Sequence, residues 1–396
     1  MKRFLLVCAV ALFAPVALTA PGSARQQLEK IERAASGSRT DALLIMRDGE
    51  VLLERFASED RSPIELMSAT KSIVALGIGL LIADGHLESI DTPVHRFYPE
   101  WAQGLKRAIT VRMLLEHSSG LQNHPNAGAE IEPAPDVVQL ALAADLDAVP
   151  GETFSYNNKA TNLLAGVIAK ASGEPMDVYL QRRLFDPLAI KPGPWLKDAA
   201  GNPWGMAGLS LTAADAAKLG QLLLDEGVTP DGARLLPEGF VASLFTPGAR
   251  SERVGLLWWR APAWETYELL SVAGERLRAK GVPANVAAAL GTLAGRRFDS
   301  RNALLEAMAA ALGPGGNDVY GREIRQRGLS IDDLFENRRG PAAAYLADGY
   351  LGQYIVVVPE KRLVAVRQIR RRDDHRSPQD NYGAFSADVI ALAGAL

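Results

Sequence analysis

Short apolar runs bounded by turn residues predict β-strands at both ends of the chain. Near the N-terminus, two such runs flank Asp48-Gly49, a dipeptide typical of a tight β-hairpin. Near the C-terminus, the runs are rich in β-branched side chains, and a polar turn separates the last two. The predicted strands cover residues 42–46, 51–56, 255–260, 343–347, 352–359 and 363–369.

Apolar residues at helical spacing fill the middle of the chain and also close it. Residues 68–83 are almost wholly apolar after Lys71, which predicts a helix that is buried on all sides. Thr212 precedes an alanine-rich run and can cap it, with Asp215 in the first turn. The other predicted helices cover residues 26–35, 111–116, 160–171 and 382–396.

The order of these elements predicts an α+β fold. Strands at both termini with helices between them do not follow the regular alternation of a parallel sheet. We therefore expect one antiparallel sheet, flanked by terminal helices, with a helical subdomain inserted at about residues 68–245. The charged stretch at about residues 261–340 separates two predicted strands, so we expect an extra helical insertion at the sheet edge or over a cleft.

The composition excludes several classes of function. The 396 residues carry a net charge of -3, without the basic surplus that nucleic-acid binding needs, so we expect no nucleic-acid partner. A single cysteine excludes a scaffold held by disulfide bonds, and it does not suffice for a zinc site built from cysteines. The five histidines have no metal-ligand spacing, and we expect neither a metal nor an organic cofactor.

Residues 1–24 have the pattern of a secretory signal peptide. A positively charged start precedes an apolar run from Phe4 to Ala20, and small residues follow. A membrane anchor is the alternative, but the run is short for a span and contains a proline. We expect cleavage after Ala20 or Ala24. A single catalytic domain of residues 25–396, with no membrane span, would then lie in the periplasm or outside the cell.

The first candidate for chemistry is Ser68 with Lys71, at the start of the predicted buried helix. Residues three apart on a helix share a face, so the hydroxyl and the amine can point into one cleft. Burial lowers the pKa of a lysine and lets it act as a base. Backbone N–H groups at a helix start can also hold an oxyanion. Taken alone, the pattern equally fits a helix cap followed by a lysine that reaches solvent.

Two further segments offer groups that such a nucleophile needs. A hydroxyl at Tyr156 can relay a proton beside a lysine, and the amide of Asn158 can hold a substrate carbonyl. Gly349 would let a substrate lie along a sheet edge, where the Tyr350 N–H can serve as a second oxyanion donor. Taken alone, the first segment also fits a turn before a helix, and the second a hairpin with an Asp-Gly turn.

Together and in this order, these segments resemble the serine β-lactamase and penicillin-binding-protein superfamily, specifically the class C β-lactamase-related branch with its esterase and amidase members. Ser68-x-x-Lys71 matches the nucleophile motif, and Tyr156-x-Asn158 matches the second motif of that branch. The third motif departs from the family. Ala347-Asp348-Gly349 lacks the usual cation and gains an acid, which we expect to repel a substrate carboxylate.

The resemblance implies a β-lactamase/transpeptidase-like fold and a serine hydrolase that acts on a small ester, amide or peptide. Ser68 would attack the carbonyl, and Lys71 with Tyr156 would act as general base and acid. Substrate binding would fall to Asn158, Gly349 and Tyr350. Two alternatives remain: a β-lactamase or D-peptidase acting on penicillins or peptidoglycan, and a catalytically idle binding protein of the same fold.

Overall fold

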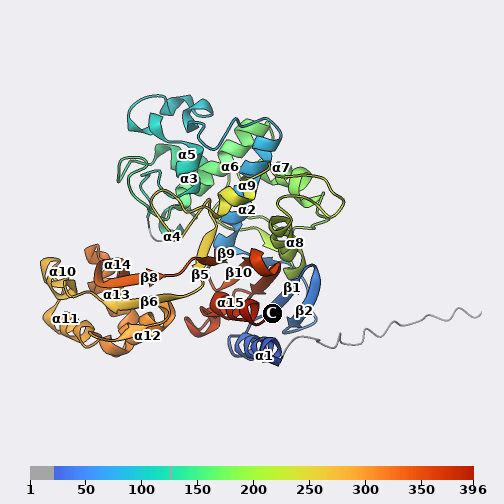
Figure 1. Ribbon diagram of the computed structural model, residues 1–396. Helices are drawn as coiled ribbons and strands as arrows, with labels where there is room; N and C mark the ends of the chain where they lie inside the picture. Colours follow the sequence, from blue (N-terminus) through green and yellow to red (C-terminus); the bar gives the residue numbers. More distant parts are fainter. Residues whose placement is uncertain (1–21, 125–126) are drawn as a thin grey trace, which may run out of the picture.

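The computed structural model describes residues 22–124 and 127–396 (Figure 1). Most of the predicted signal segment therefore lies outside the described residues. Its last three positions begin helix α1 (Gly22–Gly37), in which Ala24 is buried. Among the described residues, no helix is both long enough and apolar enough to cross a membrane.

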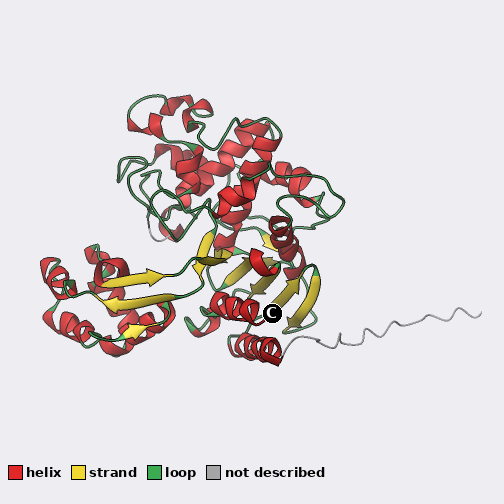
Figure 2. Cartoon of the chain, in the orientation of Figure 1, coloured by secondary structure: helices red, strands yellow, loops and turns green. Residues whose placement is uncertain are grey.

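A six-stranded antiparallel sheet joins the two ends of the chain, as predicted (Figure 2). The strand order is β2-β1-β11-β10-β9-β5, so the N-terminal hairpin pairs with the last strand of the chain. The strands are β1 (Ala42–Arg47), β2 (Glu50–Phe56), β5 (Trp259–Pro262), β9 (Ala342–Gly349), β10 (Gln353–Val358) and β11 (Leu363–Gln368).

Helices cover both faces of this sheet. Helices α1 and α15 (Phe385–Ala395) pack on each other and share one hydrophobic core with one face of the sheet. Helix α8 (Ala213–Leu224) packs on the other face, where it contacts β1, β10 and β11. Thr212 caps α8 as predicted, because its hydroxyl accepts a hydrogen bond from the Asp215 N–H at 3.1 Å.

The helical subdomain packs beside that second face and contains the predicted buried helix α2 (Thr70–Ala83). Every α2 residue from Thr70 to Leu81 is buried, as expected for a helix that is apolar all round. The other elements here are α3 (Val111–Leu115), α4 (Ala127–Glu130), α5 (Val137–Ala143), α6 (Asn158–Ser172), α7 (Met176–Leu180), α9 (Phe240–Phe245), β3 (Ile64–Glu65) and β4 (Ser210–Leu211).

The predicted strand at residues 255–260 is wrong in its first four positions. Residues 255–258 form a tight turn, in which Gly255 N–H donates to the Trp258 carbonyl at 2.9 Å and Leu257 has a φ of 59°. These residues are apolar because they are buried in the core of the helical subdomain. A short apolar run cannot by itself distinguish such a turn from a strand.

The insertion leaves the sheet between β5 and β9 and extends away from the sheet edge (Figure 1). It is not purely helical as predicted, because it also contains a three-stranded sheet of order β7-β6-β8. Two of these strands, β6 and β8, contain charged residues and so lack the apolar pattern by which strands were predicted. Its elements are β6 (Glu265–Leu269), α10 (Ala273–Ala279), α11 (Ala284–Gly291), β7 (Arg297–Phe298), α12 (Arg301–Leu312), α13 (Gly316–Glu323), α14 (Ile331–Leu334) and β8 (Phe335–Arg339).

We predict that the insertion can be removed without unfolding the rest of the chain. It has its own hydrophobic core, and its two ends meet where Ala263 N–H donates to the Pro341 carbonyl at 2.8 Å. Replacing residues 264–340 with Asn-Gly should turn β5 and β9 into a simple hairpin. Thermal unfolding followed by circular dichroism should remain cooperative, with a midpoint within a few degrees of the full chain. A broad or absent transition would contradict this prediction.

Candidate active site

Ser68 lies in a single 3₁₀ turn, Met67–Ala69, immediately before α2. Met67 has a φ of 50°, which places a non-glycine residue in the left-handed region. Such a conformation costs about 1–3 kcal/mol and persists only where the surroundings enforce it. The buried Met67 side chain packs with Leu351 and Ile369, so residues of the sheet end hold the nucleophile turn in place.

The structure brings the Lys71 amine to the Ser68 hydroxyl. Lys71 Nζ lies 3.2 Å from Ser68 Oγ and 2.7 Å from the Met206 carbonyl oxygen, and Lys71 is only 3% exposed. Burial lowers the pKa of Lys71, and the neighbouring Tyr156 partly opposes this shift. A neutral amine that donates to Met206 can turn its lone pair towards the serine hydroxyl.

Met206 is a site residue that the sequence did not indicate. Its backbone N–H donates to Asn162 Oδ1 at 3.0 Å, which ties its carbonyl to helix α6. The preceding Gly205 approaches the α6 backbone so closely that a Cβ there would overlap the Thr161 carbonyl oxygen. This contact between a loop and a helix fixes the acceptor that orients Lys71, and no sequence motif signals it.

Tyr156 comes from the segment just before α6 and lies beside Lys71. The centre of its ring is 4.9 Å from Lys71 Nζ. The ring stacks on Trp259 with centroids 6.1 Å apart, and it also lies against His117 at 4.7 Å. Three elements thus hold Tyr156 from the sides: the segment before α6, strand β5 and the segment that follows α3.

Asn157, between the two predicted residues of the second motif, anchors them. Its Oδ1 caps α6 by accepting from Ala160 N–H at 2.8 Å, and its Nδ2 donates to the Leu121 carbonyl at 2.6 Å. Asn158 itself has a buried Oδ1 with no hydrogen-bond partner among the described residues. One acceptor of Asn158 is therefore unused, and the carbonyl-holding role expected from the sequence stays a prediction.

His117 is a second residue whose place in the site was not predicted. It is 2% exposed, and its Nδ1 accepts a hydrogen bond from Asn157 N–H at 3.1 Å. Burial, together with the nearby Lys71 charge, lowers the pKa of His117 to about 3. The imidazole is therefore neutral at ordinary pH and carries its proton on Nε2. Its place in the His-Ser-Ser-Gly stretch was the available sequence signal.

The end of β9 lies against the nucleophile turn. Gly349 has no room for a side chain, because a Cβ there would overlap the Leu66 carbonyl oxygen and lie 3.2 Å from Ala69 N. Strand β5 pairs with β9 only as far as Leu346. Among the described residues, no strand pairs with residues 347–349 on that side. This open edge, ending at Tyr350, is where the sequence predicted that substrate would lie.

Asp348 does not face the nucleophile, contrary to the expectation that it would repel a substrate carboxylate. Successive strand residues point to opposite faces. Tyr345 and Ala347 pack with the helical subdomain, whereas Leu346 packs with the terminal helices. Asp348 therefore lies on the terminal-helix face, opposite Tyr354 on β10. Relative to the resembled family, the missing cation at Ala347 is therefore the one change of charge in this motif on the face that packs with the helical subdomain.

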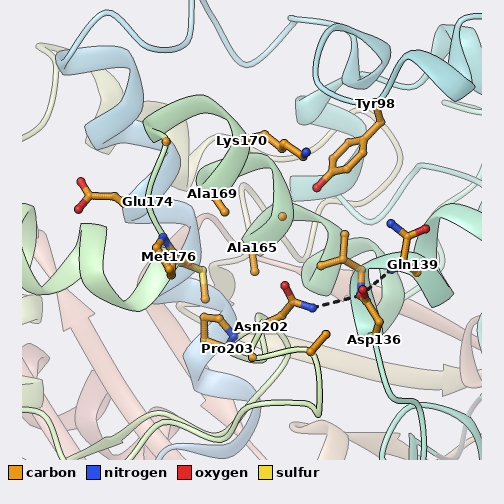
Figure 3. A pocket seen from close by; sticks show the side chains of 16 residues that line it. Tyr98, Asp136, Gln139, Ala165, Ala169, Lys170, Glu174, Met176, Asn202 and Pro203 are labelled. Carbon is orange, nitrogen blue, oxygen red and sulfur yellow. Dashed lines mark hydrogen bonds between the residues drawn. The ribbon is translucent and has the colours of Figure 1, made fainter.

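A separate pocket of about 430 Å³ lies along the C-terminal half of α6 (Figure 3). Tyr98, Lys170 and Asn202 are among its lining residues, and none of the predicted catalytic residues lines it. Among the described residues, no group of histidine, cysteine, aspartate or glutamate side chains is arranged to hold a metal ion.

Comparisons with known proteins agree with this architecture. The family model described as Beta-lactamase matches residues 26–388. The 6-aminohexanoate-dimer hydrolase of Paenarthrobacter ureafaciens is 29% identical over 250 residues, which cover 57% of this chain and 62% of that protein. Esterase EstB of Burkholderia gladioli is 29% identical over 177 residues, which cover 37% of this chain and 45% of that protein. The match thus spans less than two thirds of either relative.

Solved structures share the fold across most of the chain. A structure described as a class C beta-lactamase superposes with a TM-score of 0.55, over 91% of this chain and 95% of that one. The two sequences are 15% identical, so this likeness concerns the fold alone. The β-lactamase/transpeptidase-like α+β fold expected from the sequence is confirmed.

We predict that Gly349→Ala will displace the nucleophile turn. The added methyl group must push against backbone atoms of residues 66 and 69, at a cost of about 1–3 kcal/mol in the free energy of unfolding. The rate at which a fluorophosphonate labels Ser68 should fall on the order of 10²-fold. The control is Gly291→Ala in α11, where a Cβ meets nothing within 4 Å. Equal labelling of both variants would contradict the prediction.

We predict that His117 makes the fold less stable in acid. The folded protein holds the pKa of His117 near about 3, against 6.5 for an unperturbed histidine. Below pH 6.5 the unfolded chain binds a proton that the folded chain does not bind. The free energy of unfolding therefore falls by roughly 1.4 kcal/mol for each pH unit of acidification.

Urea unfolding between pH 7 and 4.5 checks this dependence. The free energy of unfolding should depend less steeply on pH in His117→Gln, by the amount that corresponds to about one proton. This dependence should not change in His86→Gln, which alters an exposed histidine. An unchanged slope in His117→Gln would show that this residue is not the source of the acid sensitivity.

Proposed function

This chain belongs to the β-lactamase family, and we propose that it is a serine hydrolase that cleaves an ester or amide bond through an acyl-enzyme on Ser68. The observation that carries the proposal is the placement of the Lys71 amine. It is buried, its Nζ lies 3.2 Å from Ser68 Oγ, and its other polar contacts are the Met206 carbonyl and the side chain of Tyr156. A desolvated amine in this position is suited to remove the serine proton.

Acylation begins when the neutral Lys71 amine takes the proton from Ser68 while Oγ bonds to the substrate carbonyl carbon. The carbonyl oxygen becomes an oxyanion and accepts hydrogen bonds from the backbone N–H groups of Ser68 and Tyr350. The tetrahedral intermediate then collapses, and the bond to the leaving group breaks. The proton held by Lys71 reaches that leaving group through the Tyr156 hydroxyl, which leaves the amine neutral again.

Deacylation repeats these steps with water as the nucleophile. Water loses a proton to the Tyr156–Lys71 pair as its oxygen attacks the acyl carbon, and the bond to Ser68 Oγ breaks. The serine oxygen recovers the proton, and the acid product leaves. His117 stays neutral throughout, because burial lowers its pKa to about 3.

Two features support uncharged ester or amide substrates. Ala347 takes the place of the cation that grips a substrate carboxylate in the resembled family, so that grip is missing. The unpaired Asn158 Oδ1 offers an acceptor to the N–H of an amide. Among the relatives, one is named as a hydrolase of the 6-aminohexanoate dimer and another as an esterase.

We also propose export of the chain with cleavage after Ala20. Helix α1 begins at Gly22, and its Ala24 side chain is buried. A cut after Ala20 leaves this helix whole, whereas a cut after Ala24 removes a buried residue. The mature chain would lie in the periplasm or outside the cell, and because Cys8 is removed it would contain no cysteine.

Hydrolysis of p-nitrophenyl butyrate by the mature protein tests the proposed reaction. Ser68→Ala should lower kcat by at least about 10³-fold, because it removes the atom that forms the acyl-enzyme. The matched control is Ser72→Ala on the same helix, since the Ser72 hydroxyl bonds to the Leu257 carbonyl at 2.7 Å instead of to Lys71. That control should keep most of the activity.

The outcomes separate the alternatives. Equal rates in the parent and Ser68→Ala proteins would refute the serine mechanism for this ester. Stable labelling of Ser68 by a fluorescent penicillin, without ester turnover, would favour the β-lactamase or D-peptidase alternative. Neither turnover nor labelling would favour an idle binding protein that kept the fold.

A further inference from the structure

Another cavity lies where the insertion joins the main sheet. Its volume is about 400 Å³, within the range of pockets that bind small molecules. It lies between the end of β5 and the end of β8, which meet at this junction (Figure 1). The cavity is lined by Glu252, Arg260, Pro262, Arg339, Gly340, Pro341 and Ala342.

Arg260 lines this cavity with donors that are not fully used. Its side chain is 17% exposed, and its Nη1 donates to the Glu252 backbone carbonyl at 2.6 Å. Its Nε is buried and has no hydrogen-bond partner among the described residues. An unpaired buried donor on a charged group is costly, and guanidinium groups in proteins normally find an acceptor.

Arg339 lines the same cavity from the insertion, and its side-chain hydrogen bonds among the described residues go to a neutral amide. Its Nε, at 2.9 Å, and its Nη2 both donate to Asn337 Oδ1, a neutral amide oxygen. The same oxygen also accepts a hydrogen bond from Arg253 Nη2 at 3.3 Å. Burial and the nearby Arg253 charge lower the pKa of Arg339. Two cations thus share one neutral acceptor beside the cavity.

The acidic groups nearby are engaged elsewhere or turned to solvent. Asp332 pairs with Arg253 at 3.1 Å. Glu265 accepts from the Tyr267 hydroxyl at 2.8 Å and from Arg301 N–H at 3.1 Å. Glu252 accepts a long hydrogen bond from Arg260 Nη1 at 3.4 Å, and its side chain is 76% exposed. Of these three carboxylates, only Glu252 can compete for the cavity.

We propose that Arg260 and Arg339 form an anion-binding site that takes a carboxylate or phosphate group of a small molecule. Guanidinium groups bind such anions through paired, charge-assisted hydrogen bonds, and both arginines line one cavity. A bound anion bridges β5 of the main sheet and β8 of the insertion, so it fastens the insertion to the sheet edge.

This site is separate from the proposed catalytic centre. Arg260 lies opposite Tyr345 in the sheet, and Tyr345 precedes Gly349 by four residues. That separation is about 13 Å along the strand. Binding of the anion therefore does not depend on the reaction at Ser68.

Titration calorimetry on the full chain, with inorganic phosphate and citrate at constant ionic strength, tests the proposal. We expect saturable binding of at least one probe, and the tighter one identifies phosphate or carboxylate as the preferred group. Arg260→Gln and Arg339→Gln should each weaken binding at least about tenfold. Glu252→Gln should tighten it, because it removes the one competing carboxylate. Ser68→Ala should bind as the parent does.

Arg297→Gln is the matched control, since it removes the same charge from an exposed arginine of the insertion. If this control and Arg339→Gln weaken anion binding equally, the effect comes from net charge alone, and the proposed site is overturned. Absence of saturable binding, or unchanged affinity in both arginine variants, would also overturn it. Glu252→Gln keeps the test decisive if an arginine variant folds poorly, because unchanged affinity there contradicts the proposal.

Discussion

The catalytic arrangement depends on the burial of one amine. Lys71 lies on a helix enclosed by the protein along most of its length, so its amine is removed from water. Burial disfavours the ammonium form, and the same enclosure leaves few polar groups within reach. Within reach are the Met206 carbonyl, the Ser68 hydroxyl and the side chain of Tyr156. The chemistry proposed for this site follows from that small set of contacts.

The parts that hold this amine come from distant regions of the sequence. Helix α6 fixes Met206 through Asn162, and Asn157 with His117 fixes the segment that carries Tyr156. The sheet contributes from its own side, because Gly349 allows β9 to touch the nucleophile turn. The insertion connects β5 to the start of β9, the end of that strand far from Gly349, and these two strands pair at the edge of the sheet. The cavity proposed to bind an anion thus has none of the proposed catalytic residues in its lining.

Several features could be predicted from local pattern because they depend on neighbouring residues. The Asp48-Gly49 hairpin, the apolar run of α2 and the Thr212 cap each follow from a few adjacent side chains. Predictions failed where a buried turn had the apolar pattern of a strand, as at residues 255–258. They also failed where strand residues were charged, as in β6 and β8. Asp348 was misjudged because its face depends on what packs above and below the sheet.

The sequence by itself determined the family, the order of elements and the identity of the motif residues, because residue type and short spacing carry that information. The family resemblance is confirmed by the family model. Only the tertiary structure decided that Met206 and Asn162 orient the base, that His117 is neutral and buried, and that two arginines of different segments share a cavity. These contacts join residues far apart in the chain. Their geometry is set by packing between elements, which no local pattern encodes.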